Sequence, residues 1–168
     1  MTSYVDIDED IDFGFDVDKL ILDLLNAVCD REQCPYEACI NVYVTHSETV
    51  RVYNRDYRDK DTTTDVLSFP ALDIRDGDFE DAVDSSDSPF DPESGELILG
   101  DIVINADRVY SQAEEYGHSV LREFAFLCAH SLYHLCGYDH ETEDEAHIME
   151  QKQEETLRSL NITRDTHV

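Results

Sequence analysis

Three histidines in the last third of the chain have the types and spacing of metal ligands. His130, His134 and His140 form the pattern H-x-x-x-H-x-x-G-x-x-H. On an α-helix, side chains four residues apart project from the same face about 5 to 6 Å apart, so His130 and His134 can bind one ion together. Gly137 can adopt a left-handed conformation that ends the helix and lets His140 turn back towards them. The spacing therefore predicts a metal site with three imidazole ligands.

The chemistry of such a site is catalytic rather than structural. Three neutral imidazoles leave one position of a tetrahedral ion for water or substrate. The ion lowers the pKa of its bound water towards about 7 and polarises a carbonyl or phosphoryl oxygen. All-imidazole ligation favours zinc, although nickel, copper and iron accept the same set. We predict one Zn²⁺ per chain, and we interpret the remaining histidines as surface or capping residues: His46, His118, His147 and His167.

Metzincin zinc peptidases share this spacing and need a glutamate directly after the first histidine as general base. Ser131 occupies that position here. A serine cannot take a proton from zinc-bound water at neutral pH, so peptide hydrolysis would need an acid from elsewhere in the fold. A metallopeptidase-like hydrolase therefore stays as an alternative.

The charge distribution limits the partners. The 168 residues include 40 Asp and Glu against 12 Lys and Arg, a formal net charge of −28. Three acidic segments supply 22 of these negative charges: residues 1–18, 73–98 and 141–155. A broad cationic face for duplex nucleic acid or anionic lipid is incompatible with this balance, and we expect neither DNA nor a membrane as partner. The opposite sign is concentrated in residues 51–60, which hold four of the 12 basic residues and carry a net charge of +2.

Other features of the composition concern location. No apolar run approaches the roughly 20 residues needed to cross a bilayer. The N-terminal segment lacks the basic and apolar regions of a secretory signal. Five cysteines without a C-x-x-C pair indicate reduced, buried thiols rather than a disulfide framework. These observations predict a soluble cytoplasmic protein.

Hydrophobic periodicity predicts five helices that would position the candidate residues. Four are expected over residues 17–28, 105–116, 119–136 and 142–160. The fifth is expected after a capping box formed by Thr45 and Glu48, with its buried side made by four residues: Val50, Tyr53, Asn54 and Tyr57. Residues 119–136 are apolar on most of the helix circumference, which predicts that this helix is central.

Three short strands are expected at residues 40–45, 65–69 and 97–104. Residues 73–98 are rich in Gly, Pro, Ser and Asp without usable periodicity, which predicts a long mobile surface loop. A few strands among several helices indicate an α+β fold.

Three stretches of the sequence resemble the YbeY endoribonuclease family. They are residues 57–70, which contain YRDKD and TDVLSFP, residues 99–104 (LGDIVI), and residues 130–140. Their order and spacing agree with the family over roughly residues 15–160. The departures are Ser131 and Tyr133, where the family usually has Gly and Leu, and the acidic segment 73–98.

The resemblance implies one domain over residues 1–168, with an acidic N-terminal segment at 1–15 and an acidic surface loop at 73–98. It implies an α+β fold with a small mixed β-sheet packed against several helices, the central helix carrying the H-x-x-x-H motif. The implied activity is a zinc-dependent endoribonuclease that cleaves single-stranded RNA. The implied role is maturation of the 16S ribosomal RNA 3′ end and ribosome quality control, with the small ribosomal subunit or its associated proteins as partners. A weakly active, metal-bound ribosome-associated factor is a further alternative.

The resemblance also assigns roles to residues. His130, His134 and His140 correspond to the metal ligands, and Arg58 and His130 to the catalytic residues. A guanidinium matches a phosphate with paired donors, so Arg58 would hold the scissile phosphodiester and neutralise charge that develops on it.

Other residues near these motifs are each compatible with two roles. Lys60 and Arg55 would bind the flanking RNA backbone, or serve as solvated charges at a helix end. Asp139 would orient a histidine, or cap a turn. Tyr57 or Tyr138 would stack on a base, or belong to the core. Either water or the ribose 2′-hydroxyl would act as nucleophile.

Overall fold

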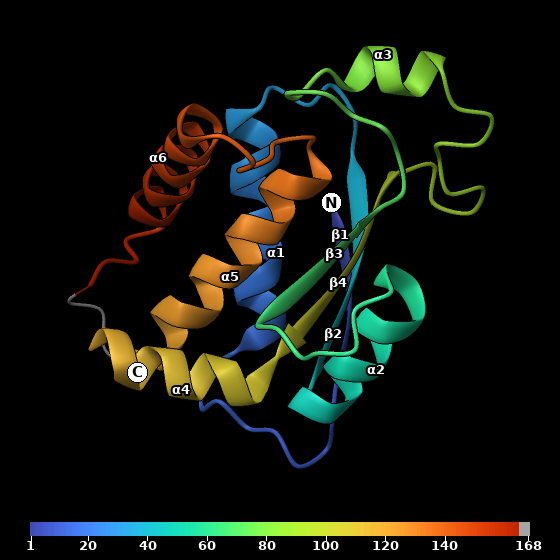
Figure 1. Ribbon diagram of the computed structural model, residues 1–168. Helices are drawn as coiled ribbons and strands as arrows, with labels where there is room; N and C mark the ends of the chain where they lie inside the picture. Colours follow the sequence, from blue (N-terminus) through green and yellow to red (C-terminus); the bar gives the residue numbers. More distant parts are fainter. Residues whose placement is uncertain (165–168) are drawn as a thin grey trace.

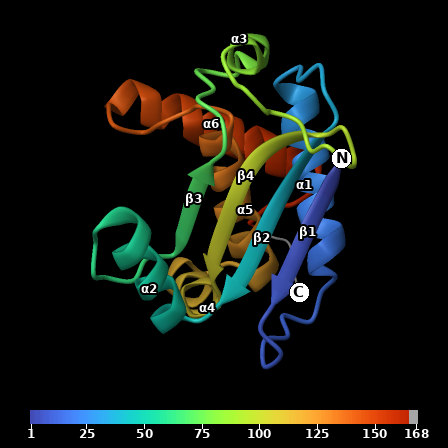
Figure 2. The same cartoon turned by 90° about the vertical axis from the view of Figure 1, so that its right-hand side faces the viewer.

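A four-stranded mixed β-sheet forms the centre of the fold in the computed structural model, which describes residues 1–164 (Figure 1). Figure 2 shows its strands in the order β1-β2-β4-β3. The pairs β1–β2 and β2–β4 are parallel, and β3 is antiparallel to β4. The strands are β1 (Thr2–Ile7), β2 (Ala38–Thr45), β3 (Val66–Pro70) and β4 (Leu97–Asn105). β3 is therefore an edge strand.

Six helices within residues 1–164 surround this sheet unequally. They are α1 (Val17–Arg31), α2 (Ser47–Arg58), α3 (Phe79–Asp84), α4 (Ala106–Tyr116), α5 (Val120–Leu135) and α6 (Glu143–Ser159). α1, α5 and α6 lie on one side of the sheet and α2 on the other (Figure 1). The predicted α+β class, with its small mixed sheet, is confirmed. All helices of the described residues are too short or too polar to span a bilayer.

The core lies between the sheet and α5. Helix α5 packs against α1, α4, α6 and β3, and the side chains of Cys128, Ala129 and Leu132 are inaccessible to solvent. The central position predicted for this helix follows from its apolar circumference. All five cysteines are free thiols, and four of them are buried, as the sequence predicts.

Side chains cap the starts of three helices. The side chains of Asp16, Ser119 and Thr142 each accept a hydrogen bond from the backbone N–H three residues later. The capping box predicted at Thr45 and Glu48 is wrong. Helix α2 begins at Ser47, whose N–H donates to a carboxylate oxygen of Asp107 at 2.8 Å, so an acid from another helix caps this end.

The prediction of a loop throughout residues 73–98 is also wrong. This segment contains α3, and three of its apolar side chains are buried in the main hydrophobic cluster: Ile74, Phe79 and Ala82. Asp78 caps α3 by accepting the Asp81 N–H. The segment thus packs on the core through a few apolar side chains. Its acidic composition gave no indication of this packing.

The outer end of α2 differs from the expectation in a way that concerns the site. Val50 and Asn54 are buried as predicted, and Val50 packs against Leu67 and Val103. Tyr57, by contrast, is 70% exposed. It lies in the last turn of α2, with its ring 5.8 Å from that of Phe69 on the edge strand β3.

Candidate metal centre

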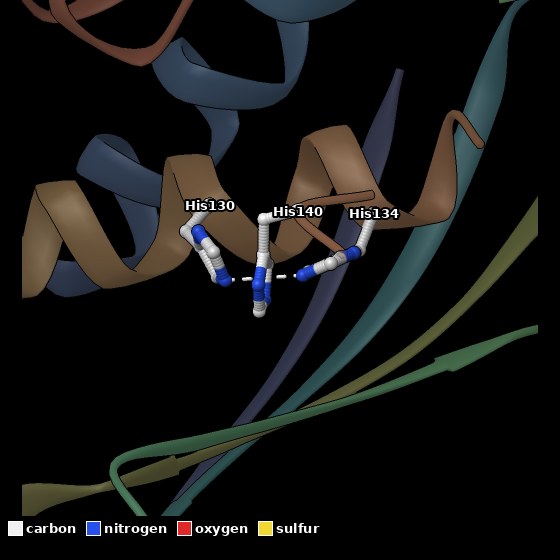
Figure 3. A group of neighbouring side chains, drawn as sticks. All are labelled: His130, His134 and His140. Carbon is white, nitrogen blue, oxygen red and sulfur yellow. Dashed lines mark hydrogen bonds between the residues drawn. The ribbon is translucent and has the colours of Figure 1, made fainter. Parts of the chain in front are cut away.

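The C-terminal end of α5 and the turn after it bring the three predicted ligands together (Figure 3). His130 and His134 project from one face of α5, and the chain turns back at Gly137, where φ is +94°. A Cβ atom at this glycine would lie 2.0 Å from the carbonyl oxygen of Ile74, so no other residue fits without movement of the backbone. The tight turn brings the centre of the His140 ring to 5.3 Å from that of His130 and 5.1 Å from that of His134.

The geometry fits a shared metal ion. One ligand atom of each histidine lies within 4.8 Å of those of the other two. The Nε2 atoms of His130 and His134 are 3.0 Å apart. Two nitrogens bound at about 2.0–2.1 Å to a tetrahedral zinc ion lie about 3.3 Å apart. The arrangement therefore suits zinc without rearrangement of α5.

The protonation of the imidazoles also suits metal binding. Burial, followed by repulsion from the neighbouring imidazoles, lowers the pKa of His130 to about 4, and burial lowers the pKa of His134. Both rings are therefore neutral at pH 7. His134 Nδ1 donates to the backbone oxygen of Tyr138 at 2.9 Å, which leaves its Nε2 lone pair directed towards the other two rings.

Gln153 of α6 is a functional candidate that sequence reasoning missed. Its side chain is 1% exposed and acts on the pKa of His130, and its Nε2 atom has no hydrogen-bond partner within residues 1–164. Metal-ligating imidazoles are commonly oriented by such an outer polar partner. A signal was present in the sequence, because Gln153 lies four residues from both Met149 and Leu157 and so shares their buried side of α6.

An open cleft of about 1040 Å³ surrounds the three imidazoles. Arg58, from the end of α2, and Lys60 line it together with the histidines, so these predicted residues are brought to one place. Within residues 1–164, neither cation forms a salt bridge with an acid. Three acids also line the cleft: Asp65, Asp139 and Glu141.

The other two basic residues of segment 51–60 do not line this cleft. Arg55 pairs with Asp56, and Arg51 pairs with Glu48 and Asp61. Of the four basic residues in segment 51–60, two therefore line the cleft and two are paired with neighbouring carboxylates.

The two departures from the family pattern do not enter the cleft. Ser131 is fully buried, and its hydroxyl hydrogen-bonds that of Ser68 on β3 at 2.8 Å. Tyr133 is also fully buried, and its hydroxyl hydrogen-bonds Thr156 of α6 at 2.6 Å. Each polar group added to α5 thus has a partner on a neighbouring element. Asp139 accepts the backbone N–H of His140 at 2.8 Å and so braces the turn that carries the third ligand.

A second group of possible ligands contains Asp8, Asp10 and His46. Both ring nitrogens of His46 are already used: Nδ1 contacts Asp107 at 2.9 Å, and Nε2 contacts Asp10 at 2.8 Å. The Asp107 and Asp10 carboxylates raise the pKa of His46 to about 9. His46 is therefore an imidazolium at pH 7 without a lone pair for a metal, in contrast to the histidines of α5.

The remaining histidines differ in their surroundings. His147 is exposed, as predicted. His118 lies between the end of α4 and the start of α5, its side chain is 8% exposed, and its Nε2 contacts Glu123 at 2.9 Å. His167 lies outside the described residues.

Fold and site together define an α+β protein whose central helix and following turn present three imidazoles in an open cleft. The chain belongs to the YbeY family: a sequence model described as endoribonuclease YbeY matches residues 4–161.

Relatives agree with this assignment, and a solved structure shares the fold. Proteins named endoribonuclease YbeY from Lachnoclostridium phytofermentans and Lachnospira eligens are each 44% identical to the chain, over 98% of its length and 100% of theirs. The relative from Acetivibrio thermocellus is 37% identical over 95% of the chain and 96% of its own length. The solution structure of a Thermotoga maritima protein matches the fold with a TM-score of 0.55 at 20% identity, over 95% of this chain and 92% of that one.

Proposed function

We propose that the protein is a zinc-dependent endoribonuclease that cleaves single-stranded RNA. The observation that carries the proposal is the meeting, in one open cleft, of three imidazoles and Arg58, which forms no salt bridge within residues 1–164. Membership of a family named for endoribonuclease activity supports RNA as the substrate.

His130, His134 and His140 would hold one zinc ion. When bound, this ion supplies Lewis-acid stabilisation of a phosphoryl oxygen and lowers the pKa of a coordinated water. The Arg58 guanidinium donates paired hydrogen bonds to the non-bridging oxygens of the scissile phosphate and neutralises negative charge that develops there. Lys60 contacts the flanking backbone from the same side of the cleft.

The chain offers little support for peptide hydrolysis. Ser131 stands where a metzincin has its general base, and its hydroxyl is buried against Ser68 and does not line the cleft. Arg58 lies in the cleft, and its paired donors suit a phosphodiester better than an uncharged peptide group.

Family membership supports a biological substrate as well. We propose that the enzyme acts in the cytoplasm on the 3′ end of 16S ribosomal RNA, with a part in ribosome quality control, and that it meets this RNA on the small subunit. Cleavage of precursor RNA within purified small subunits, but not of the mature 3′ end, is the expected result for this role.

The decisive experiment combines metal analysis with a cleavage assay. Purified protein should contain about one zinc per chain by elemental analysis, since a three-histidine site binds one ion. It should cleave single-stranded RNA, leave duplex RNA and an unfolded protein intact, and stop when a chelator is added. His134→Ala should lose most of the zinc and the activity, whereas Arg58→Ala should keep the zinc and lose cleavage.

The variants also control for contaminating nuclease, because a contaminant would be unaffected by either substitution. Full zinc retention by His134→Ala would contradict the ligand assignment. Normal cleavage by Arg58→Ala would remove the phosphate role. Zinc binding without cleavage by the wild type would favour a metal-bound ribosome-associated factor, and degradation of the unfolded protein would favour a peptidase.

A further inference from the structure

An aromatic cluster extends from the rim of the metal cleft onto the other face of the sheet. It contains Tyr43 of β2, Tyr53 and Tyr57 of α2, and Phe69 of β3. The rings of Tyr53 and Tyr57 stack with centroids 5.8 Å apart and an interplanar angle of 21°. Phe69 meets Tyr57 edge-on at 5.8 Å, and Tyr43 meets Tyr53 at 6.2 Å. These rings line a second cavity of about 710 Å³ on the sheet face that bears α2.

Tyr57 joins the two cavities, because it lines both the metal cleft and the aromatic one. Along β3, Ser68 and Pro70 line the metal cleft, whereas Phe69 lines the aromatic cavity. The two cavities therefore lie on opposite faces of this edge strand, and Tyr57 adjoins both of them.

The surroundings of Tyr57 are those of a stacking platform. Its side chain has the largest exposed fraction of the large hydrophobic residues described, 70%. Its ring stacks with that of Tyr53, and with 70% of the residue exposed much of the ring is accessible to a ligand. The adjacent residue, Arg58, lies with its guanidinium carbon 5.9 Å from the centre of the Phe69 ring, and it lines the metal cleft.

Tyr138, the other tyrosine of the cleft, does not offer a comparable surface. The ammonium group of Lys152 lies 4.7 Å from the centre of its ring, and Tyr133 packs edge-on against it at 5.9 Å. Its ring is therefore engaged on the protein side.

We propose that Tyr57 binds the nucleobase next to the scissile phosphate by stacking, and thereby selects single-stranded RNA. This inference rests on the proposed function. A phosphate held by Arg58 brings the attached nucleoside to the neighbouring residue, Tyr57, and a base lies flat on an aromatic face whatever its sequence. A base inside a duplex is covered on both faces, so it reaches Tyr57 only after it leaves the stack, which costs free energy.

The charges of the aromatic cavity favour a base over the phosphate backbone. Its far side carries Asp6 and Asp101, and Asp101 accepts a hydrogen bond from Asn41 at 2.9 Å. These carboxylates repel phosphates, whereas Arg58 and Lys60 attract them on the cleft side. The backbone thus stays in the cleft, and the base turns over the rim onto the aromatic ring.

The test is a double-mutant cycle between protein and RNA. Zinc-loaded wild type and Tyr57→Ala are compared on a short single-stranded RNA with one mapped cleavage site, and on versions that carry an abasic nucleotide on either side of that site. Loss of one base–aromatic stack is expected to lower kcat/KM about tenfold. At one flanking position, the abasic nucleotide should cost the wild type about tenfold and cost Tyr57→Ala almost nothing.

Two variants give the controls. Tyr57→Phe keeps the ring and should retain the wild-type rate and the abasic penalty. Tyr116→Ala removes another exposed tyrosine, on α4 and outside both cavities, and should change neither. Tyr57→Ala should also lose much of the preference for single-stranded over duplex RNA, which a purely structural role of the ring would not affect.

The outcomes separate this inference from the proposed function. If the wild type shows no chelator-sensitive RNA cleavage, both fail. If the wild type cleaves normally and abasic penalties are equal in wild type and Tyr57→Ala at both flanking positions, the stacking role alone is overturned. The aromatic cavity would then be a site for a protein segment.

Discussion

At the scale of single residues, the candidate centre depends on groups that orient the imidazoles as well as on the imidazoles themselves. His134 is fixed by its Nδ1–H, which donates to the Tyr138 carbonyl. Gln153, which is buried on α6, acts instead on the pKa of His130. The turn after α5 and the helix α6 thus each contribute to the orientation of one imidazole of the same metal site.

Replacement of Gln153 should weaken zinc binding. Removal of the outer partner of a ligating imidazole typically lowers metal affinity about 10- to 100-fold. We expect a loss of this size for Gln153→Ala, measured by competition with a chromogenic chelator. Gln151→Ala, on an exposed position of the same helix, provides the control. Equal zinc affinity of Gln153→Ala and wild type would show that His130 needs no support from α6.

At the scale of elements, the turn after α5 decides whether the third ligand reaches the other two. The backbone at Gly137 is in the left-handed region, and the Ile74 carbonyl fills the space where a side chain would begin. The same contact joins the turn to the start of the acidic segment 73–98. The ligand turn and this segment therefore form one packed unit.

We predict that Gly137→Ala destabilises the protein by more than 1 kcal/mol and also lowers its zinc content. Backbone strain alone would contribute about 1 to 2 kcal/mol to the loss of stability. Gly117→Ala is the matched control. This glycine also ends a helix with positive φ, of +70°, but a Cβ atom added to it would have no neighbouring atom within 4 Å. Urea unfolding and elemental analysis of both variants would distinguish strain from collision. Unchanged zinc in Gly137→Ala would contradict the role of the turn.

Elements with strong apolar periodicity and a capping side chain could be predicted from the sequence. α1, α4, α5 and α6 are of this kind, and the H-x-x-x-H spacing follows from α5. β1 was missed because its outward positions carry polar and acidic residues and its apolar positions are only partly buried at the sheet edge. Helix α3 is too short to show a hydrophobic period in the sequence, although Phe79 anchors it in the core.

The missed features share a physical cause. The N-cap of α2 is a carboxylate that is distant in sequence, Asp107, and the exposure of Tyr57 depends on where α2 passes the edge of the sheet. The contact between Gln153 and His130 likewise depends on how α6 packs on α5. Local patterns encode elements, whereas these features arise from the contacts between elements.

The ion pairs of His46 link the starts of α1, α2 and α4, and they make the stability of the protein depend on pH. Asp10 precedes α1, His46 precedes α2, and Asp107 is in the first turn of α4. Asp8 also faces this imidazole. The folded-state pKa of His46 is raised from 6.5 to about 9. The stability contributed by these pairs is therefore fully present below pH 6.5 and is lost as the pH rises through about 9.

We expect the difference in unfolding free energy between wild type and His46→Gln to shrink as the pH rises through about 9. The comparison with His46→Gln removes the contribution of other titrating groups, including the many carboxylates. Urea unfolding at a series of pH values on either side of this range would measure it. A constant difference would mean that the imidazolium form does not hold the three elements together.

At the scale of the whole molecule, the net charge of −28 is distributed so that the cleft is much less acidic than the rest. The cleft is lined by two cations, Arg58 and Lys60, and by three acids, Asp65, Asp139 and Glu141, a net charge of −1 with neutral histidines. A bound Zn²⁺ would change this local charge to +1. Attraction of an anionic substrate by this cleft is therefore tied to metal loading.

This distribution predicts weak, local binding of RNA with a shallow dependence on salt. Each neutralised phosphate of a single strand contributes about −0.7 to the slope of log K against log salt concentration. Two cations in the cleft then give a slope of about −1.4 for the zinc-loaded protein. Arg58→Ala should make the slope shallower, about −0.7. Stopped-flow anisotropy with a labelled single-stranded RNA, recorded before cleavage, would measure both slopes. A slope several times steeper would contradict this prediction, because it would require a broad cationic surface. A chain with 12 basic and 40 acidic residues cannot provide such a surface around this cleft. Tight recognition on a ribosomal particle would therefore have to come from contacts made by the particle itself.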